Sequence, residues 1–242
     1  VVAYNPKTGE FRSGQVDLPE GFKHYIIKFK EDPETPTSEI EMIWYEMARE
    51  AGITIMPCFL KSIDGRNHFM TERFDRVNGE KIFTQTLAAI LPGADDYLKI
   101  VWLANTPVLP QEDREQLFLR MVFNFAAGVS DDHNKNFSFT MSRDGKWRLA
   151  PAYDVTFTVN LINMFRADRH AMTVGGIDRE VGRDMLLRIA EENDVKNAAS
   201  IIRQVTDSVM SFGTLANEQN IERPVSDLVL KYLSGQMTAL KD

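Results

Sequence analysis

Hydrophobic and polar residues in the first third of the chain alternate with the two-residue period of β-strands. The clearest case is His24–Lys30, which reads HYIIKFK and therefore presents two distinct faces. Asp64-Gly65, a dipeptide typical of tight hairpin turns, separates two further apolar runs. Strands are therefore expected at Val1–Tyr4, Glu10–Arg12, His24–Lys30, Cys58–Ile63 and His68–Phe74.

One amphipathic helix is expected among these strands, at Ser38–Ala51, because apolar residues recur there at three- and four-residue spacing. Its first residue and Glu41 have the spacing of a capping box. Glu41 therefore has two interpretations. It caps the helix, which the spacing favours, or it faces inward and pairs with Lys28. Glu46 is the weaker alternative for the inward role.

Helical periodicity replaces the strand pattern after about residue 75, apart from one hairpin around Asp144-Gly145. Asp113 and Gln116 have the spacing of a helix cap. This order predicts an α+β fold of two lobes, a strand-rich N-lobe at residues 1–75 and a mostly helical C-lobe at residues 76–242. The expected C-lobe helices are Tyr97–Leu103, Asp113–Gly128, Arg183–Glu192, Asn197–Phe212 and Ser226–Leu240, and the expected hairpin strands are Phe137–Met141 and Trp147–Leu149.

The composition is that of an ordinary globular protein, with 43% hydrophobic and 26% charged residues among 242. A net charge of −7 argues against binding of nucleic acid or an anionic membrane through the overall field. No apolar run approaches the roughly 18 residues of a membrane span. Cys58 is the only cysteine, so no disulfide forms within the chain, and a cytoplasmic location is expected.

The stretch from residue 123 to 155 carries the candidate chemistry. Asp131 and Asn136 are five residues apart, and Asp154 follows after one hairpin. Protein kinases use an Asp, an Asn and a second Asp in this order to hold a hydroxyl and magnesium ions. Taken alone, the polar loop is also explained as a turn. The spacing to Asn136 selects Asp131 rather than Asp132 for the place beside the hydroxyl, and Lys28 would supply the cation on the phosphates.

Several neighbouring polar residues have alternative interpretations. The four histidines give no metal-ligand spacing, so His133 is expected to hydrogen-bond to backbone and hold the loop. Lys135 contacts a phosphate or faces water. Lys28 sits on a covered part of its strand or extends to water as an edge-strand lysine, and Lys30 is expected to be the solvent lysine. The charged stretch Glu72–Arg76 has two interpretations. It is a connector between the lobes that borders a ligand cleft, or it is a cluster of charges exposed to solvent.

At these residues the chain resembles the HipA family of bacterial serine/threonine kinases. The family's catalytic loop, Asp-x-His-x-Lys-Asn-Phe-Ser, is matched from Asp131 to Ser138, and its metal motif, Leu-Ala-Pro-x-Tyr-Asp, from Leu149 to Asp154. The further matches are Glu-Arg-Phe-Asp-Arg at Glu72–Arg76, Ile-Ile-Lys at Ile26–Lys28 and a later family stretch at His170–Gly176.

The resemblance implies an ATP- and Mg²⁺-dependent serine/threonine kinase with a two-lobed, protein-kinase-like fold. Asp131 would be the catalytic aspartate, and Asn136 and Asp154 would be the magnesium ligands. The nucleotide-binding residues would be Lys28 on the phosphates, Glu72, Arg73 and Phe74 beside the adenine, and His133 and Lys135 in the catalytic loop.

The sequence departs from the family in one respect. Family members carry a glycine-rich phosphate loop ahead of the residues that match Val1–Tyr4, and these 242 residues do not contain it. The N-lobe is therefore expected to be incomplete at its N-terminus, and ATP binding is expected to be weaker without the backbone amides of that loop. The resemblance also implies a protein substrate and, since the family often acts as the toxin of a toxin–antitoxin pair, a DNA-binding antitoxin partner.

Two other functions stay open on the same residues. A pseudokinase or regulatory binding module would keep the fold without phosphate transfer. A small-molecule or lipid kinase would use the same loop on the hydroxyl of a different substrate. Binding of Mg-ATP separates the first from a kinase, and substrate profiling separates the second.

Overall fold

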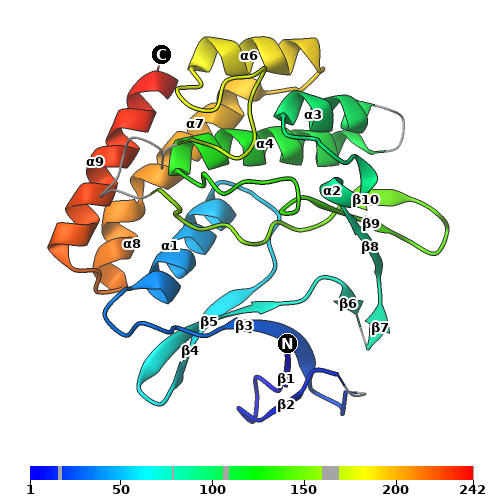
Figure 1. Cartoon of the computed structure of the whole chain (residues 1–242), viewed down its shortest axis with the longest axis vertical. Helices are drawn as coiled ribbons and strands as arrows, with labels where there is room; N and C mark the ends of the chain where they lie inside the picture. Colours follow the sequence, from blue (N-terminus) through cyan, green and yellow to red (C-terminus); the bar gives the residue numbers. More distant parts are fainter. Residues whose placement is uncertain (16–17, 78, 106–108, 160–168, 242) are drawn as a thin grey trace.

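The computed structural model of the chain describes residues 1–15, 18–77, 79–105, 109–159 and 169–241, with the side chains of residues 102–105 left out. A five-stranded antiparallel sheet forms one end of the molecule (Figure 1). Its strands are β1 (Val2–Tyr4), β2 (Phe11–Ser13), β3 (Lys23–Lys28), β4 (Cys58–Ile63) and β5 (Arg66–Glu72), in the spatial order β2-β1-β3-β5-β4.

Strand β3 lies in the middle of this sheet, because it pairs with β1 on one side and with β5 on the other. It ends at Lys28, opposite Phe69, two residues earlier than the sequence predicts. The β4–β5 hairpin turns at the predicted Asp64-Gly65. Both residues have positive φ, 50° and 74°, as the two central positions of a type I′ turn require.

Helix α1 (Thr37–Glu50) lies between the sheet and the helices of the rest of the chain (Figure 1). It begins after Pro36, and no side chain caps its first turn, so the predicted capping box is wrong. Trp44 is completely buried on this helix, and its indole nitrogen donates to the carbonyl of Ala127 at 3.0 Å. This contact fixes α1 against the helical part of the molecule.

Strands continue beyond residue 75, where the sequence analysis predicted only the hairpin strands Phe137–Met141 and Trp147–Leu149. Strand β8 (Phe83–Thr86) pairs with β9 (Ser138–Met141), and β9 pairs with β10 (Trp147–Leu149), which gives a three-stranded antiparallel sheet. The two-residue strands β6 (Arg76–Val77) and β7 (Glu80–Lys81) form a small hairpin after the connector. The unpredicted strands β6, β7 and β8 are too short to show alternation in the sequence.

The remaining elements are helices packed around a central helix, α4 (Gln111–Ala127). The predicted helix at 197–212 is interrupted near Ser211 and continues as a separate short helix. In the described residues no helix is long and apolar enough to cross a membrane. The other helices are α2 (Leu87–Ile90), α3 (Tyr97–Asn105), α6 (Arg183–Glu192), α7 (Ala198–Met210), α8 (Phe212–Glu218) and α9 (Arg223–Leu240).

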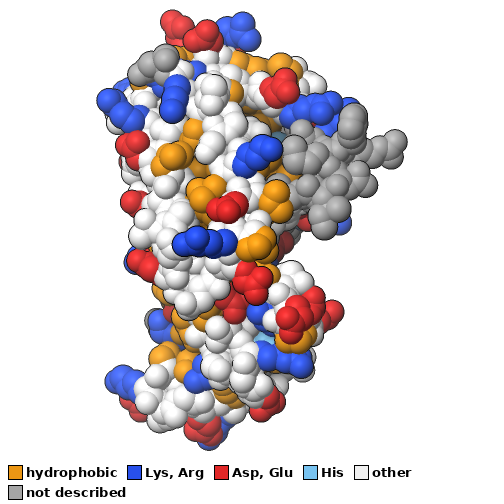
Figure 2. Space-filling model, turned by 90° about the vertical axis from the view of Figure 1, so that its left-hand side faces the viewer, with side chains coloured by type: hydrophobic (Ala, Val, Ile, Leu, Met, Phe, Trp, Pro, Cys, Tyr) orange, Lys and Arg blue, Asp and Glu red, His pale blue; other side chains and the backbone are white. Residues whose placement is uncertain are grey.

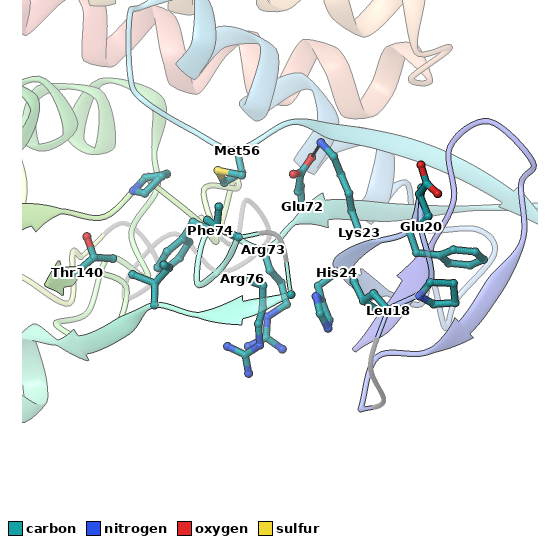
Figure 3. A pocket seen from close by; sticks show the side chains of 17 residues that line it. Leu18, Glu20, Lys23, His24, Met56, Glu72, Arg73, Phe74, Arg76 and Thr140 are labelled. Atoms are coloured by element: carbon teal, nitrogen blue, oxygen red, sulfur yellow. Dashed lines mark hydrogen bonds and ion pairs between the residues drawn. The ribbon is translucent and has the colours of Figure 1, made fainter. Parts of the chain in front are cut away.

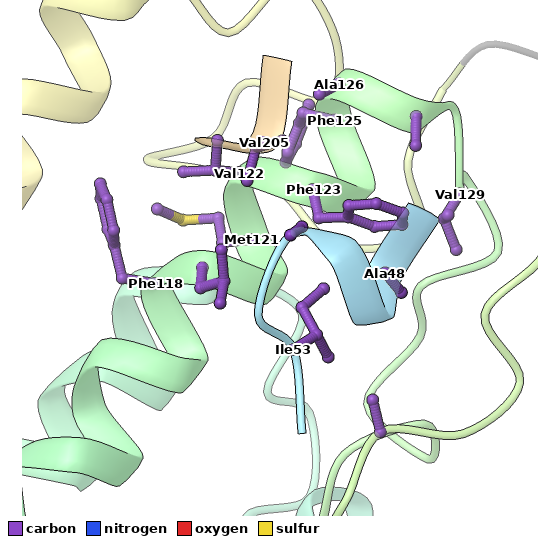
Figure 4. Packing of buried hydrophobic residues seen from close by; sticks show 14 of the residues in the cluster. Ala48, Ile53, Phe118, Met121, Val122, Phe123, Phe125, Ala126, Val129 and Val205 are labelled. Carbon is purple, nitrogen blue, oxygen red and sulfur yellow. The ribbon is translucent and has the colours of Figure 1, made fainter. Parts of the chain in front are cut away.

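The hydrophobic core surrounds α4, whose residues 117–127 are all buried. Figure 4 shows Met121, Phe123 and Phe125 of this helix packed among Ala48 of α1 and Val205 of α7. In the space-filling view the outline narrows between the smaller, strand-rich end and the larger, helical end (Figure 2). The predicted α+β fold with two lobes is therefore confirmed.

Candidate active site

The ammonium group of Lys28 contacts two carboxylates from different parts of the chain. Its Nζ donates to Oε1 of Glu41 at 2.6 Å and to the carboxylate of Asp154. Glu41 faces inward from α1, with 9% of its side chain exposed. The capping interpretation of Glu41 is therefore wrong, and the inward one is correct. At Lys28 only β5 pairs with β3, but the ammonium group is held by these two carboxylates rather than extended to water.

The charged groups of this cluster shift one another's pKa values. Burial alone would lower the pKa of Lys28, but Glu41 and Asp154 outweigh it, so the pKa lies above its ordinary value. Burial raises the pKa of Glu41, and the charge of Lys28 opposes that shift. Lys28 is therefore a firmly held cation beside two carboxyl groups.

Lys30 was expected to face water, and this prediction is wrong. Only 9% of its side chain is exposed, and its Nζ donates to Glu39 of α1 at 3.1 Å. Its backbone amide donates to Nδ1 of His68 at 3.0 Å. The chain leaves the sheet after Lys28, so the alternation of faces that predicted an exposed Lys30 ends before it is reached.

Asp154 lies on the segment that follows β10. Its φ of 56° is in the left-handed region, which costs free energy for a residue with a side chain and is common at functional sites. Two residues earlier, the amide of Ala152 donates to the carbonyl of Thr54 at 2.8 Å, and Ala152 forms a parallel bridge with Ile55. The segment is therefore anchored to the loop between α1 and β4.

Asp131 is presented to solvent, with 64% of its side chain exposed, on a loop that is fixed by hydrogen bonds to its backbone. Its amide donates to Oγ1 of Thr158 at 3.0 Å, and its carbonyl accepts from Nδ2 of Asn136 at 2.9 Å. The predicted pair Asp131 and Asn136 is thus in direct contact, and the loop holds the carboxylate outward.

His133 does not anchor the loop in the way the sequence analysis expects. Its Nδ1 is buried with no hydrogen-bond partner, and its Nε2 lies 3.9 Å from Oδ1 of Asp131. The turn is closed instead by backbone, since the amide of Asn136 donates to the carbonyl of His133 at 2.8 Å. Lys135 is exposed, and its carbonyl accepts from the hydroxyl of Tyr153 at 2.6 Å.

Asp132 is the loop's buried anchor, a role that sequence reasoning missed. None of its side chain is exposed, and its carboxylate accepts from the hydroxyl of Tyr97 at 2.7 Å and from the amide of Met172 at 3.1 Å. The same carboxylate lies 2.9 Å from Nδ1 of His170, whose ring stacks on Phe125. The match at His170–Gly176 was the one sequence signal for this contact.

Asn136 and Asp154 line the same small hollow, of about 20 Å³. An amide oxygen and a carboxylate suit Mg²⁺, which takes few protein ligands and completes its shell with phosphate and water. Among the described residues no group of three or more His, Cys, Asp or Glu could hold a metal ion. The amide and carboxylate oxygens at this hollow are a donor set that fits Mg²⁺.

The charges of the connector pair with one another. Arg73 donates twice to Asp75, at 2.7 and 2.6 Å, and Arg76 donates to the same carboxylate at 2.7 Å. Glu72 accepts from Lys23 at 2.9 Å. Figure 3 shows Lys23, Glu72, Arg73 and Arg76 around a hollow of about 670 Å³. The connector thus borders a cavity, and its charges are a paired cluster rather than a freely solvated one.

The predicted nucleotide residues line two hollows rather than one. Glu72, Arg73 and Phe74 line the hollow at the connector, whereas Lys28 and Asp154 line another of about 240 Å³. Phe74 of the first hollow stacks on the ring of Tyr153, with centroids 5.7 Å apart. Tyr153 also lines the second hollow, and its hydroxyl contacts Ser138 at 2.6 Å.

The two-lobed arrangement is that of a kinase-like fold. It is similar to HipA in the complex of the Shewanella oneidensis MR-1 toxin–antitoxin system HipA, HipB and its operator DNA, with a TM-score of 0.64 and 17% identity. It is also similar to the Helicobacter pylori proinflammatory kinase CtkA, with a TM-score of 0.63 and 10% identity. These matches cover 89% and 90% of this chain, and 57% and 87% of the respective neighbours.

The model of the HipA-like C-terminal domain matches residues 3–212, and the chain therefore belongs to this family. The curated protein "Putative kinase Y4mE" of Sinorhizobium fredii (strain NBRC 101917 / NGR234) is 26% identical in an alignment of 157 residues that covers 57% of this chain. The chain spans 36% of the length of that relative and 57% of the HipA chain. A kinase-like function follows from these relationships.

Proposed function

We propose that the protein is an ATP- and Mg²⁺-dependent serine/threonine kinase that transfers the γ-phosphate to a protein hydroxyl. The observation that carries this proposal is the contact of Lys28 with both Glu41 and Asp154. In protein kinases a strand lysine pairs with a helix glutamate, and an aspartate after the catalytic loop holds magnesium. Membership of the HipA-like family supports the same assignment.

Asp131 is proposed as the catalytic residue. Its exposed carboxylate would accept the proton of the attacking hydroxyl, while Thr158 and Asn136 hold its backbone in place. The loop presents this carboxylate to solvent, so a substrate hydroxyl can approach it.

Asn136 and Asp154 are proposed to hold Mg²⁺, which when bound neutralises charge on the phosphates. Lys28 would place its ammonium group on a phosphate, and the exposed Lys135 would add a second cation from the catalytic loop. His133, 3.9 Å from Asp131, would lie beside the transferred group.

Glu72, Arg73 and Phe74 are proposed to border the adenine. Support comes from the hollows of about 670 and 240 Å³, whose lining residues Phe74 and Tyr153 stack on each other. Volumes of this order are typical of small-molecule sites. The aromatic pair offers a flat apolar surface suited to a base.

A DNA-binding antitoxin partner is proposed for the full-length protein, which would then act as a toxin. The support is the HipA neighbour, which was solved with HipB and operator DNA. The net charge of −7 favours contact with DNA through such a partner rather than by this chain itself.

The kinase assignment is tested by incubating full-length protein with γ-labelled ATP, Mg²⁺ and a bacterial protein extract. We expect label on serine or threonine of a protein, and loss of the label with Asp131→Ala. Asp144→Ala, which removes an exposed carboxylate from the β9–β10 turn, is the matched control and should label like the wild type. Equal labelling by wild type and Asp131→Ala contradicts the assigned role.

Two other results would favour the alternative functions. Label that appears on a small molecule or lipid instead of protein supports the other kinase class. A regulatory module would give no label, and a thermal-shift measurement with Mg-ATP then decides whether the nucleotide binds. A ligand at 100 times its dissociation constant stabilises the folded state by about 2.7 kcal/mol.

A further inference from the structure

Arg120, in the middle of α4, is a buried cation that the proposed reaction does not use. Only 4% of the residue is exposed. Its Nη2 donates to the carbonyl of Ala150 at 2.8 Å and, more weakly, to the carbonyl of Thr54 at 3.4 Å, and its Nε is buried with no partner. The guanidinium therefore hydrogen-bonds to two backbone carbonyls rather than to a carboxylate.

Stability alone is a weak reason for such a residue. Removing a guanidinium from water is costly, and hydrophobic side chains of similar volume often replace buried ionic groups without loss of stability. Burial lowers the pKa of Arg120 to about 10, and the charge of Asp113 opposes this shift, so the side chain stays cationic at neutral pH. Its location offers a better explanation.

The two carbonyls that Arg120 contacts belong to the segments that carry the candidate site. Ala150 precedes Asp154 by four residues. Thr54 follows α1, the helix that carries Glu41. These segments also touch each other, because the amide of Ala152 donates to the same carbonyl of Thr54 at 2.8 Å. Arg120 thus lies at their junction, and it lines the small hollow shared by Asn136 and Asp154.

Two other polar side chains of α4 hold the same segments. Gln116 accepts from the amide of Thr54 and donates to the carbonyl of Gly52, both at 2.8 Å. Asp113 accepts from the amide of Leu149 at 2.8 Å. Residues 113, 116 and 120 lie on one face of a helix, since their spacing is three and four. This face is therefore a polar strip that joins the helical core to both halves of the site.

We propose that Arg120 is a positioning residue that fixes Asp154 relative to Lys28 and Glu41 by tying both backbone segments to α4. The consequence for phosphate transfer rests on the proposed function, whereas the structural part does not. Without the guanidinium, the bridge between Ala152 and Thr54 should open more often, and Asp154 should hold magnesium less well.

The test compares Arg120→Met and Arg120→Lys with wild type in the full-length protein. Arg203→Met, a change of the same kind at an exposed position of α7, is the matched control. Hydrogen exchange is measured at the amide of Ala152, and the Mg²⁺ concentration for half-maximal phosphate transfer is measured alongside. Loss of residues that orient metal ligands typically costs 10- to 100-fold in metal affinity or activity.

For Arg120→Met we expect a melting temperature near that of wild type, about 10-fold faster exchange at Ala152 and about a 10-fold higher Mg²⁺ requirement. The control should match wild type in all three. Wild-type exchange and Mg²⁺ dependence in Arg120→Met would overturn the proposal.

Should Arg120→Met fail to fold, Arg120→Lys decides. A lysine keeps the charge but has a single nitrogen for two carbonyls, so the same changes are expected to a smaller extent, and wild-type behaviour would again overturn the proposal. Absence of phosphate transfer by wild type would count against the proposed function alone, because the exchange at Ala152 still reports on positioning.

Discussion

Lys28 and Asp154 are 126 residues apart in the sequence, and their side chains are in direct contact. Lys28 stands at the end of a strand in the five-stranded sheet, and Asp154 follows the small sheet of the helical lobe. The contact therefore joins the two lobes at the point where the phosphates of a nucleotide are proposed to bind. Glu41 completes the cluster from α1.

Replacement of Lys28 by methionine should weaken nucleotide binding. A hydrogen bond to a charged group contributes about 1.5–3 kcal/mol, so we expect Mg-ATP affinity to fall about 10- to 100-fold in a calorimetric titration. Lys30→Met is the control, because Lys30 also pairs with a glutamate of α1 but lies outside the site. An equal loss of affinity in both variants would contradict the role of Lys28.

Substitutions at the neighbours Asp131 and Asp132 should have different effects, with a large loss of stability expected only at Asp132. Asp132→Asn replaces a buried carboxylate, which contacts Tyr97 and His170, by an amide whose NH₂ group cannot accept a hydrogen bond. We expect a loss of about 2–4 kcal/mol in the free energy of unfolding. Asp131→Asn changes an exposed group and should alter it by less than about 0.5 kcal/mol. Urea unfolding measures both, and a similar cost for the two changes would show that the buried network is misassigned.

The sequence predicted the parts of the site that depend on local spacing. Asp131, Asn136 and the Asp64-Gly65 and Asp144-Gly145 turns could be read from neighbouring residues. Lys28 and Asp154 were assigned to one site only because both matched kinase roles, and their direct contact was not predicted. The assigned roles of these residues remain predictions, as does the division of the chain at residue 75.

The errors arose where distant residues decide the outcome. Glu41 fitted a capping box, but the charge of Lys28 on a facing strand draws it inward. Lys30 is covered by Glu39 rather than exposed. The anchoring role of Asp132 was missed because its partners Tyr97 and His170 lie 35 and 38 residues away. Long-range partners of this kind leave no periodic signal in one sequence.

Asp75 should make the connector sensitive to acid. Burial alone would raise the pKa of Asp75, but Arg73 and Arg76 outweigh it, so the folded-state pKa lies below the ordinary 3.8. The stabilisation is therefore fully present above the unfolded-state pKa and is lost as the pH falls through the lower folded-state value.

Asp75→Asn should consequently cost about 1 kcal/mol of unfolding free energy at pH 7. The difference from wild type should shrink as the pH falls below 3.8, because the native carboxylate becomes protonated at its lower folded-state pKa. Urea unfolding at pH 7, 5, 4 and 3 measures it. A difference that is constant over this range, or largest in acid, would show that the two arginines do not depress the pKa.

Gly128 ends α4 in the left-handed region, with φ of 66°, and a methyl group there would lie 2.6 Å from Tyr232 and 2.9 Å from Phe157. Gly128→Ala should therefore lower the free energy of unfolding by about 2–4 kcal/mol, through backbone strain and overpacking. Gly93→Ala is the control, since its φ is 78° but nothing lies within 4 Å, and about 1–2 kcal/mol is expected. Equal costs would exclude the packing contribution.

The central claim is that Asp131 acts on the hydroxyl while Lys28 and Asp154 hold the nucleotide. Single-turnover transfer of labelled γ-phosphate, measured with full-length wild type and Asp131→Asn at saturating Mg-ATP, tests it most directly. We predict unchanged Mg-ATP affinity and a transfer rate at least about 100-fold lower in Asp131→Asn. A general base typically accelerates a reaction by about 100-fold or more, and this variant lacks it. Transfer at the wild-type rate would contradict the claim.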